Sequence, residues 1–227
     1  MNGLNNLAII PARAGSKRIP GKNIRDFLGK PIIAYPIETA LKSKLFRRVL
    51  VSTDSEEIAS VAKMFGAEVP FLRSNENSDD MATLSDVTEE VLSLLNKKGE
   101  FFENVCCILP TSPLITVNSL KKGLDLLTSE GYSSIRPVVP YSYPVQRAFR
   151  MKENKVEFLF PENQRTRSQD LEKIVHDAGQ FYWFKASRGL KDENRGAFLI
   201  SELNAQDIDT EDDWKMAELK FQLINQP

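Results

Sequence analysis

Short apolar runs of strand length alternate with longer segments in which apolar residues recur at helical spacing. The strand-like runs lie at residues 7–12, 47–54, 68–74, 104–110 and 133–141, and the helical patterns lie at 31–44, 55–66, 85–98 and 117–131. This alternation predicts a mainly parallel sheet that is covered by helices. We therefore expect an α/β fold.

Signals at the ends of the helical patterns support these boundaries. Asp54 followed by Glu57 fits a capping box at the start of 55–66, and Gly66 stands where that helix should end. Pro36 falls inside the pattern at 31–44 and indicates a kink or a late start. A last helix is expected at 210–224, with Thr210 as its N-cap.

The alternation breaks down between about residues 141 and 200. Two short strand-like runs, VEFLF and QFYWF, flank the polar stretch PENQRTRSQDLEK. Because about 60 residues make only a marginal core alone, we predict a single domain, residues 1–227, with an insertion or dimerisation arm at about 141–200. The aromatic run QFYWF can equally be a core strand with alternate residues buried.

Composition excludes several classes of function. The chain carries 30 basic and 31 acidic residues, a formal charge of −1, so no overall field attracts nucleic acid or an anionic membrane. No apolar run approaches the roughly 20 residues of a membrane span, and the N-terminus lacks a signal pattern. We expect a soluble cytoplasmic protein. Cys106 and Cys107 should point to opposite faces of a strand, and the single histidine, His176, excludes a multi-histidine zinc site.

The loop after the first apolar run, GSKRIPGKN, is close to a P-loop but does not match one. Five residues separate Gly15 from Gly21, and Asn23 replaces the hydroxyl that would bind magnesium. A strand followed by a Gly/Ser turn still suits a polyphosphate at the carboxyl edge of a parallel sheet. The positive charge would come from Arg13, Lys17, Arg18 and Lys22. The alternative is a solvated basic turn.

Two acidic residues near the C-terminus, Asp207 and Asp209, form a candidate metal site. In an extended segment they project to one face while Ile208 projects to the other. Two carboxylates together with triphosphate oxygens are a usual arrangement for Mg²⁺. The alternative is that both residues only begin the acidic first turn of the last helix.

The segment IIPARAGSKRIPGKN resembles the N-terminal signature IIPARGGSKxIPxKN of the cytidylyltransferases that activate sialic acid and related nine-carbon acids. Ala14 and Gly21 depart from that signature. The similarity extends in family order over nearly the whole chain through KPIIAYPIETA, VSTDSEEIA, FLRSNENSDDMAT, PTSP and QDIDTEDDW. It implies a three-layer, Rossmann-like nucleotide-diphospho-sugar transferase fold with a mainly parallel sheet, an enzyme that uses CTP and Mg²⁺, and a homodimer.

The resemblance also implies roles for individual residues. Arg13, Lys22, Asp207 and Asp209 correspond to the catalytic set, in which Asp207 and Asp209 hold the metal. The expected nucleotide-binding residues are Arg13, Ala14, Gly15, Ser16, Lys22, Asn23, Arg73, Asp80 and Thr83. Leu84 stands where some relatives carry a hydroxyl, which leaves the contacts to the base open at that end.

The reaction implied is attack of a sugar's anomeric hydroxyl on the α-phosphorus of CTP, with release of pyrophosphate. An arginine fork suits the carboxylate of a nine-carbon sugar acid. The candidate sugar-binding residues are Arg147, Arg165, Arg167, His176 and Gln180. A solvated basic loop is the alternative for the arginines, and His176 is also a possible general base.

The segments SYPVQRA, TRSQDL and HDAGQFYWF are similar to the branch of the family that acts on pseudaminic acid. Leu109 stands before PTSP, where sialic acid members often carry Gln. This predicts formation of CMP-pseudaminic acid for bacterial surface glycans or flagellin glycosylation. The alternatives are a CMP-sialic or CMP-legionaminic acid synthetase and a non-catalytic nucleotide-sugar-binding protein.

Overall fold

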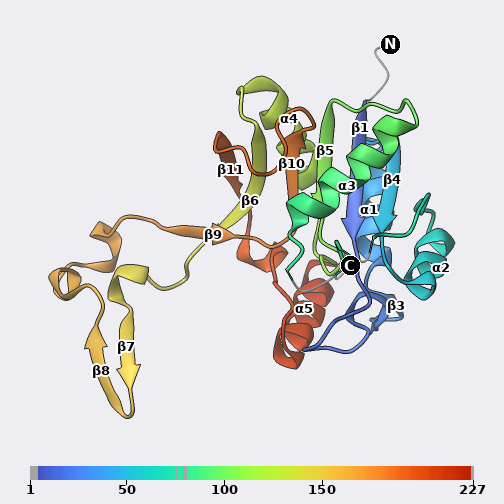
Figure 1. The fold of residues 1–227 in the computed structure, drawn as a ribbon. Coiled ribbons are helices and arrows are strands. Elements are labelled where there is room, and N and C mark those ends of the chain that lie inside the picture. The colour runs from blue at the N-terminus through green and yellow to red at the C-terminus, as the bar shows by residue number, and fades with distance from the viewer. Residues whose placement is uncertain (1–4, 75, 79–80, 226–227) are drawn as a thin grey trace.

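The computed structural model describes residues 5–74, 76–78 and 81–225. Across these residues a seven-stranded sheet has the order β11-β6-β10-β5-β1-β4, with β9 beside β6 (Figure 1). β10 runs antiparallel to β5 and β6, and β9 runs antiparallel to β6, whereas the other pairs are parallel. The sheet is therefore mixed, with mostly parallel strands. Its strands are β1 Asn6–Pro11, β4 Arg48–Ser52, β5 Asn104–Ile108, β6 Ser134–Pro140, β9 Val175–Asp177, β10 Phe181–Lys185 and β11 Arg195–Leu199.

Helices cover both faces of the sheet and confirm the predicted three layers. On one face α1 (Ala34–Ser43), α2 (Glu56–Met64) and α4 (Val117–Ser129) share a core with the sheet, and α3 (Leu84–Lys97) packs on the other face. Cys106 belongs to the first core and Cys107 to the second, as the alternation of a strand requires. No helix in the described parts of the chain is long and apolar enough to cross a membrane.

The last helix, α5 (Glu211–Ile224), belongs to a separate small core. It packs against the segment after β1, which includes the short strands β2 (Asp26–Phe27) and β3 (Lys30–Pro31). Ile19 from the basic loop and Ile208 from the acidic segment are both fully buried in this core. Burial of these two side chains together places the acidic segment beside the basic loop.

Several local predictions are confirmed and others are wrong. α1 begins at Ala34, the late start that Pro36 indicated, and Thr210 caps α5. The N-cap of α2 is Ser55 rather than Asp54, because the Ser55 side chain accepts the Ile58 backbone N–H at 3.3 Å. The strand predicted at 68–74 is absent from the described residues there, which contribute an isolated bridge between Leu50 and Glu68.

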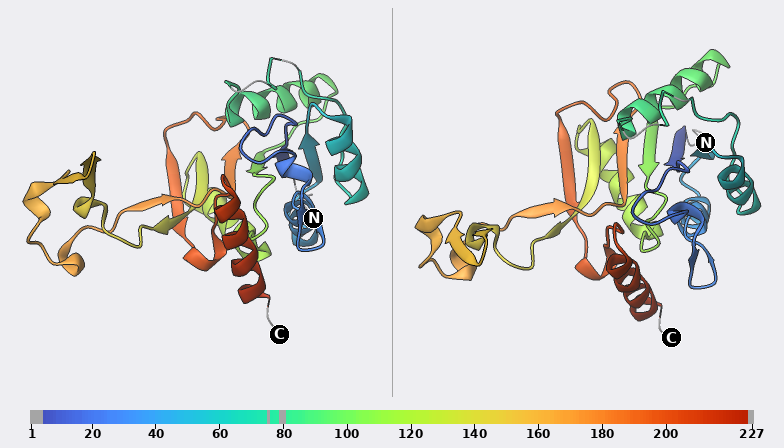
Figure 2. Two further views of the ribbon diagram at one scale, coloured as in Figure 1. Left: turned by 90° about the horizontal axis from the view of Figure 1, so that it is seen from below. Right: turned by 60° about the horizontal axis from the view of Figure 1, so that its bottom comes forward.

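The predicted insertion at 141–200 divides into two parts. The hairpin of β7 (Phe149–Lys152) and β8 (Lys155–Phe158) projects away from the body together with its flanking turns (Figures 1 and 2). These turns are the 3-10 helices Val145–Arg147, Pro161–Asn163 and Ser168–Asp170. In contrast, β9, β10 and β11 belong to the main sheet. The projecting arm is therefore 141–174, shorter than predicted, and QFYWF is a core strand in which Trp183 and Phe184 are fully buried.

Candidate active site

The loops after β1 and β5 border one cavity at the carboxyl edge of the sheet. Because β10 is antiparallel to β5, its beginning at Gln180 reaches the same edge, where Leu109 N–H donates to the Gln180 carbonyl at 2.8 Å. Ligands of open α/β sheets bind at such an edge. The cavity has a volume of about 500 Å³. It is lined by Pro11, Arg13, Ser16, Lys17, Arg18, Lys22, Asn23, Leu109, Pro110, Thr111 and Asp207.

Hydrogen bonds hold the basic loop in a curled shape around this cavity. Asn23 is buried, and its side-chain amide donates to the Arg13 carbonyl at 2.9 Å. The Ala14 backbone N–H donates to Asp54 Oδ1 at 2.9 Å. Gly21 has φ of +62° and begins the 3-10 turn Lys22–Ile24, so the residue that departs from the family signature supplies a left-handed turn. The shaping role predicted for Asn23 is supported by this geometry.

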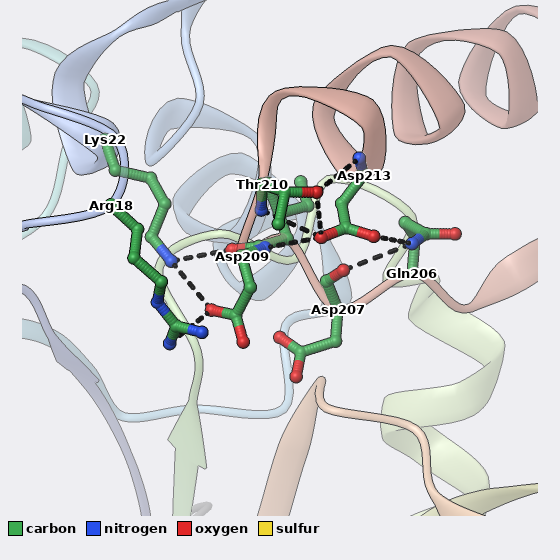
Figure 3. A network of polar contacts seen from close by, with 8 residues as sticks. Arg18, Lys22, Gln206, Asp207, Asp209, Thr210 and Asp213 are labelled. Atoms are coloured by element: carbon green, nitrogen blue, oxygen red, sulfur yellow. Dashed lines mark hydrogen bonds and ion pairs between the residues drawn. The ribbon is translucent and has the colours of Figure 1, made fainter. Parts of the chain in front are cut away.

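The acidic segment projects its carboxylates as the sequence predicts. Ile208 is fully buried in the small core, whereas Asp209 extends toward Lys22 and Arg18 of the basic loop and Asp207 lines the first cavity (Figure 3). Gly179 lies two residues before β10 and has φ of +63°. It packs closely against Asp207: a methyl group added at Gly179 would lie 3.5 Å from Asp207 Cβ. The segment is thus fixed between α5 and the edge of the sheet.

The basic loop and the acidic segment meet directly. Lys22 Nζ donates to the Ile208 carbonyl at 2.7 Å and lies 3.6 Å from Asp209 Oδ1 (Figure 3). Arg18 approaches the same Asp209 oxygen at 2.8 Å. The predicted convergence of these two parts of the chain is therefore confirmed as geometry. The pairing of Arg18 with Asp209 was not predicted, because the sequence identified Arg18 only as one of several loop cations.

The electrostatics of the acid pair favour a bound cation. Burial raises the pKa of the Asp207 carboxyl above its ordinary value, the charge of Asp209 raises it further, and Lys22 opposes the shift. A divalent cation beside both carboxylates would offset this cost. Within the described residues no group of three or more His, Cys, Asp or Glu side chains forms a metal cage. The donor set therefore fits an ion such as Mg²⁺, which keeps waters and takes substrate oxygens as ligands.

A second cavity, of about 410 Å³, adjoins the first, and Asp207 lines both. Five carboxylate residues surround it together with His176 and Lys220, namely Asp177, Glu202, Asp207, Asp209 and Asp213. The ring of His176 lies 4.7 Å from that of Tyr141, measured between centroids. His176, a predicted sugar-binding residue, is thus placed near the acid pair.

Other predicted nucleotide-binding residues lie outside the first cavity's lining. Arg73 is buried, and its Nε donates to Ser52 Oγ at 3.1 Å, which ties the chain after β4 to the sheet. Thr83 caps α3, where its side chain and Asp86 form a capping box. Asp80 lies outside the described residues. The contacts with CTP predicted for Arg73, Asp80 and Thr83 remain predictions.

The remaining sugar-binding candidates lie away from both cavities. Arg147, Arg165 and Arg167 are exposed on the arm, where Arg147 donates to the Thr166 carbonyl. Gln180 is only 2% exposed, and its amide donates to the Asn204 carbonyl in the turn before the acidic segment. This placement favours a structural task for Gln180, and its sugar contact remains a prediction.

Sequence reasoning missed two acidic residues that organise the site. Asp54 was interpreted as a helix cap, yet it holds the basic loop through the Ala14 N–H. Asp213 accepts the N–H groups of Asp209 and Thr210 at 3.1 and 2.8 Å. The signal for Asp213 was present, because an acidic residue three positions after a threonine N-cap is a capping-box pattern.

Comparisons with known proteins agree with this geometry. The model of the family described as cytidylyltransferase matches residues 7–211. A pseudaminic acid cytidylyltransferase from Campylobacter jejuni is 38% identical over 226 residues, covering 97% of each chain. A CMP-N,N'-diacetyllegionaminic acid synthase from Legionella pneumophila is 44% identical over 138 residues, covering 58% of each chain.

Among solved structures, a CMP:2-keto-3-deoxy-manno-octonic acid synthetase complexed with CTP is similar with a TM-score of 0.70. The alignment covers 96% of this chain and 99% of the other at 17% identity, so it bears on the fold alone. The family model matches most of the chain, and a relative of the same kind is 38% identical over nearly its whole length. This chain belongs to the cytidylyltransferase family.

Proposed function

We propose that this protein transfers CMP from CTP to the anomeric hydroxyl of pseudaminic acid, forming CMP-pseudaminic acid and pyrophosphate. The observation that carries the proposal is the contact of Lys22 with the Ile208 carbonyl, which joins the basic loop to the acidic segment, so that cations of the loop and Asp207 line one cavity. The choice of sugar is supported by the pseudaminic acid cytidylyltransferase from Campylobacter jejuni, which is 38% identical over 97% of both chains.

The cations of the loop are suited to the leaving group. Arg13 and Lys22 both line the first cavity, where they would offset the negative charge that builds on pyrophosphate as it leaves. Transfer of a nucleotidyl group depends on positioning and charge neutralisation, so no nucleophile from the protein is required. In this proposal the anomeric hydroxyl attacks the α-phosphorus directly, loses its proton and displaces pyrophosphate.

Asp207 and Asp209 are the residues that would hold Mg²⁺. Asp209 pairs with Arg18 and Lys22, and Asp207 lines both cavities, so it would lie between a nucleotide in the first and a sugar in the second. When bound, the ion supplies polarisation of the α-phosphate and a lower pKa for the attacking hydroxyl. The side chains of this protein hold the two substrates in place around it.

The sugar acid would occupy the second cavity, beside His176. That cavity is lined by five carboxylate residues, and the lysine among its lining residues, Lys220, donates to carbonyl and amide oxygens of the protein. The carboxylates would repel the sugar's own carboxylate unless a further cation faced it. Arg147, Arg165 and Arg167 carry suitable forked cations, but they project on the arm. We therefore propose a cytoplasmic homodimer in which the arm of a second copy brings an arginine to the sugar. Exposed apolar side chains on the arm, Phe149, Met151 and Val156, support its burial against another chain.

The test is turnover with a panel of sugar acids. The purified protein is incubated with CTP and Mg²⁺ and with free pseudaminic, legionaminic or N-acetylneuraminic acid, and pyrophosphate release is followed by a coupled assay. We expect turnover to be fastest with pseudaminic acid, with the CMP-sugar identified by mass spectrometry, and none in EDTA. A preference for another acid would reassign the substrate. Binding of CTP by calorimetry without pyrophosphate release from any acid would indicate the non-catalytic alternative.

A further inference from the structure

A lysine of the last helix braces the turn that precedes the acid pair. Lys220 Nζ donates to the carbonyls of Glu202 and Ala205 at 3.1 and 2.7 Å and to Gln206 Oε1 at 3.0 Å. An ammonium group has three protons, so these three bonds use all of its donors. Although Lys220 lines the second cavity, its hydrogen bonds are committed to the protein rather than to a bound sugar.

The bond from Lys220 also fixes the direction of the Gln206 amide. With Oε1 facing the ammonium group, Nε2 faces the opposite way and donates to the Asp207 carbonyl at 3.1 Å and to Asp213 Oδ1 at 3.3 Å (Figure 3). The second oxygen of Asp213 accepts the Asp209 backbone N–H at 3.1 Å. One chain of hydrogen bonds therefore reaches the backbone of both members of the acid pair.

The acid pair needs such support because its two carboxylates have the same charge. Like charges repel each other, and the Lys22 contact restrains the segment from the side of the basic loop. Gln206 and Lys220 restrain it from the α5 side. Groups that orient the ligands of a metal typically change metal affinity by 10- to 100-fold when they are removed.

We propose that Gln206 and Lys220 are positioning residues that set the spacing of Asp207 and Asp209 for a divalent cation. The proposal rests on the metal role of that pair in the proposed function. Neither side chain is assigned a contact with the reacting atoms. Their contribution should therefore be seen in the affinity for the metal, and not in the affinity of the loop for the nucleotide.

The test compares Gln206→Leu and Lys220→Met with Lys215→Met, a change on the same helix. Lys215 is 72% exposed, and its ion pair with Asp212 lies outside the network. Binding of Mn²⁺ in the presence of CTP is measured by water proton relaxation, CTP binding in EDTA by calorimetry, and folding by thermal melting. We expect Mn²⁺ affinity to fall about tenfold in the first two variants, with CTP binding in EDTA unchanged. Lys215→Met should match the parent protein.

An Asp207→Asn variant separates the positioning role of Gln206 and Lys220 from the metal role of the acid pair, on which it rests. If Asp207→Asn loses Mn²⁺ affinity while Gln206→Leu and Lys220→Met keep that of the parent and only melt earlier, the positioning role is overturned and the metal role stands. If Asp207→Asn itself binds Mn²⁺ like the parent, both proposals fall. Should Lys220→Met not fold, Gln206→Leu decides the question alone, because it removes only the contacts of one amide.

Discussion

Lys22 donates a hydrogen bond of 2.7 Å to the carbonyl of Ile208, a residue 186 positions further along the chain. The contact joins the loop after the first strand to the acidic segment before the last helix. The side chain of Ile208 is buried in one small apolar core together with Ile19, which lies three residues before Lys22, and this packing holds the two segments together. The catalytic proposal therefore depends on packing as much as on charge.

Replacement of Lys22 should affect turnover far more than folding. In Lys22→Ala we expect kcat for pyrophosphate release to fall about hundredfold, because one charge-assisted donor to the transition state is worth roughly 3 kcal/mol. Lys63→Ala, at an exposed position on α2, is the matched control and should retain full activity. Turnover of Lys22→Ala near that of the control would remove Lys22 from the mechanism.

Asp207→Asn should lose activity without losing stability. Burial and the charge of Asp209 raise the pKa of the Asp207 carboxyl. An acid with a raised pKa in the folded state binds its proton more tightly there, so its ionised form costs folding free energy at neutral pH. The neutral amide removes that cost, and we expect a Tm equal to or above that of the parent protein together with the loss of most turnover.

Asp212→Asn is the control for this experiment. Asp212 lies in the first turn of α5, five residues after Asp207 in the sequence. Its side chain is 95% exposed, and it is not among the residues that line either cavity. We expect both Tm and pyrophosphate release to match the parent. A clear drop in the Tm of Asp207→Asn would mean that its carboxylate stabilises the fold, contrary to the argument from burial.

Thr83 offers a test between a structural and a nucleotide-binding role. Its side chain accepts the Asp86 N–H at 3.3 Å and caps α3, the helix that covers one face of the sheet. Thr83→Ala should cost about 1 kcal/mol of folding free energy, or roughly 2–4 °C in Tm for a chain of this size. Thr83→Ser keeps the cap and should restore the Tm. An increase of the KM for CTP in Thr83→Ala that is reversed in Thr83→Ser would favour the predicted nucleotide contact.

The same cap predicts a pH dependence of stability. Hydrogen bonds from Thr83, with a smaller contribution from Lys191, lower the pKa of the Asp86 carboxyl to about 2 from its ordinary value of 3.8. Because the pKa is lower in the folded than in the unfolded state, the ionised carboxylate stabilises the fold at pH values above the pKa of the unfolded chain. This stabilisation is lost as the pH falls through 2. The difference in Tm between the parent and Asp86→Asn should therefore be largest near neutral pH and shrink between about pH 4 and pH 2.

The sequence was informative wherever a residue's task followed from its neighbours along the chain. The alternation around Ile208 predicted the direction of Asp207 and Asp209, and Pro36 predicted the late start of α1. The helix patterns were likewise recovered because apolar periodicity reports burial directly. Local pattern therefore accounted for most of the helices and strands and for the direction of the two carboxylates in the acidic segment.

What the sequence did not predict depends on contacts across the fold. Asp54 and Ser55 are both good caps, and only the folded position of Ala14 shows that Asp54 is used by the loop. The sequence left QFYWF open between the insertion and a core strand, and its pairing with β5 places it within the main sheet. Whether an arginine of the arm reaches a sugar is a question of the same kind, because in the proposed homodimer the answer depends on a second chain.

Complementation between two inactive variants tests the homodimer and its arm together. If an arginine of one chain completes the site of the other, Asp207→Asn mixed with the double variant Arg165→Ala/Arg167→Ala forms heterodimers with one intact site each. Random exchange in a two-fold dimer should then restore about a quarter of the parent activity. If each arm instead serves the site of its own chain, the mixture should show only the residual activity of the two separate variants. Light scattering should first show about twice the chain mass of 25.7 kDa, and a monomer would exclude the shared site.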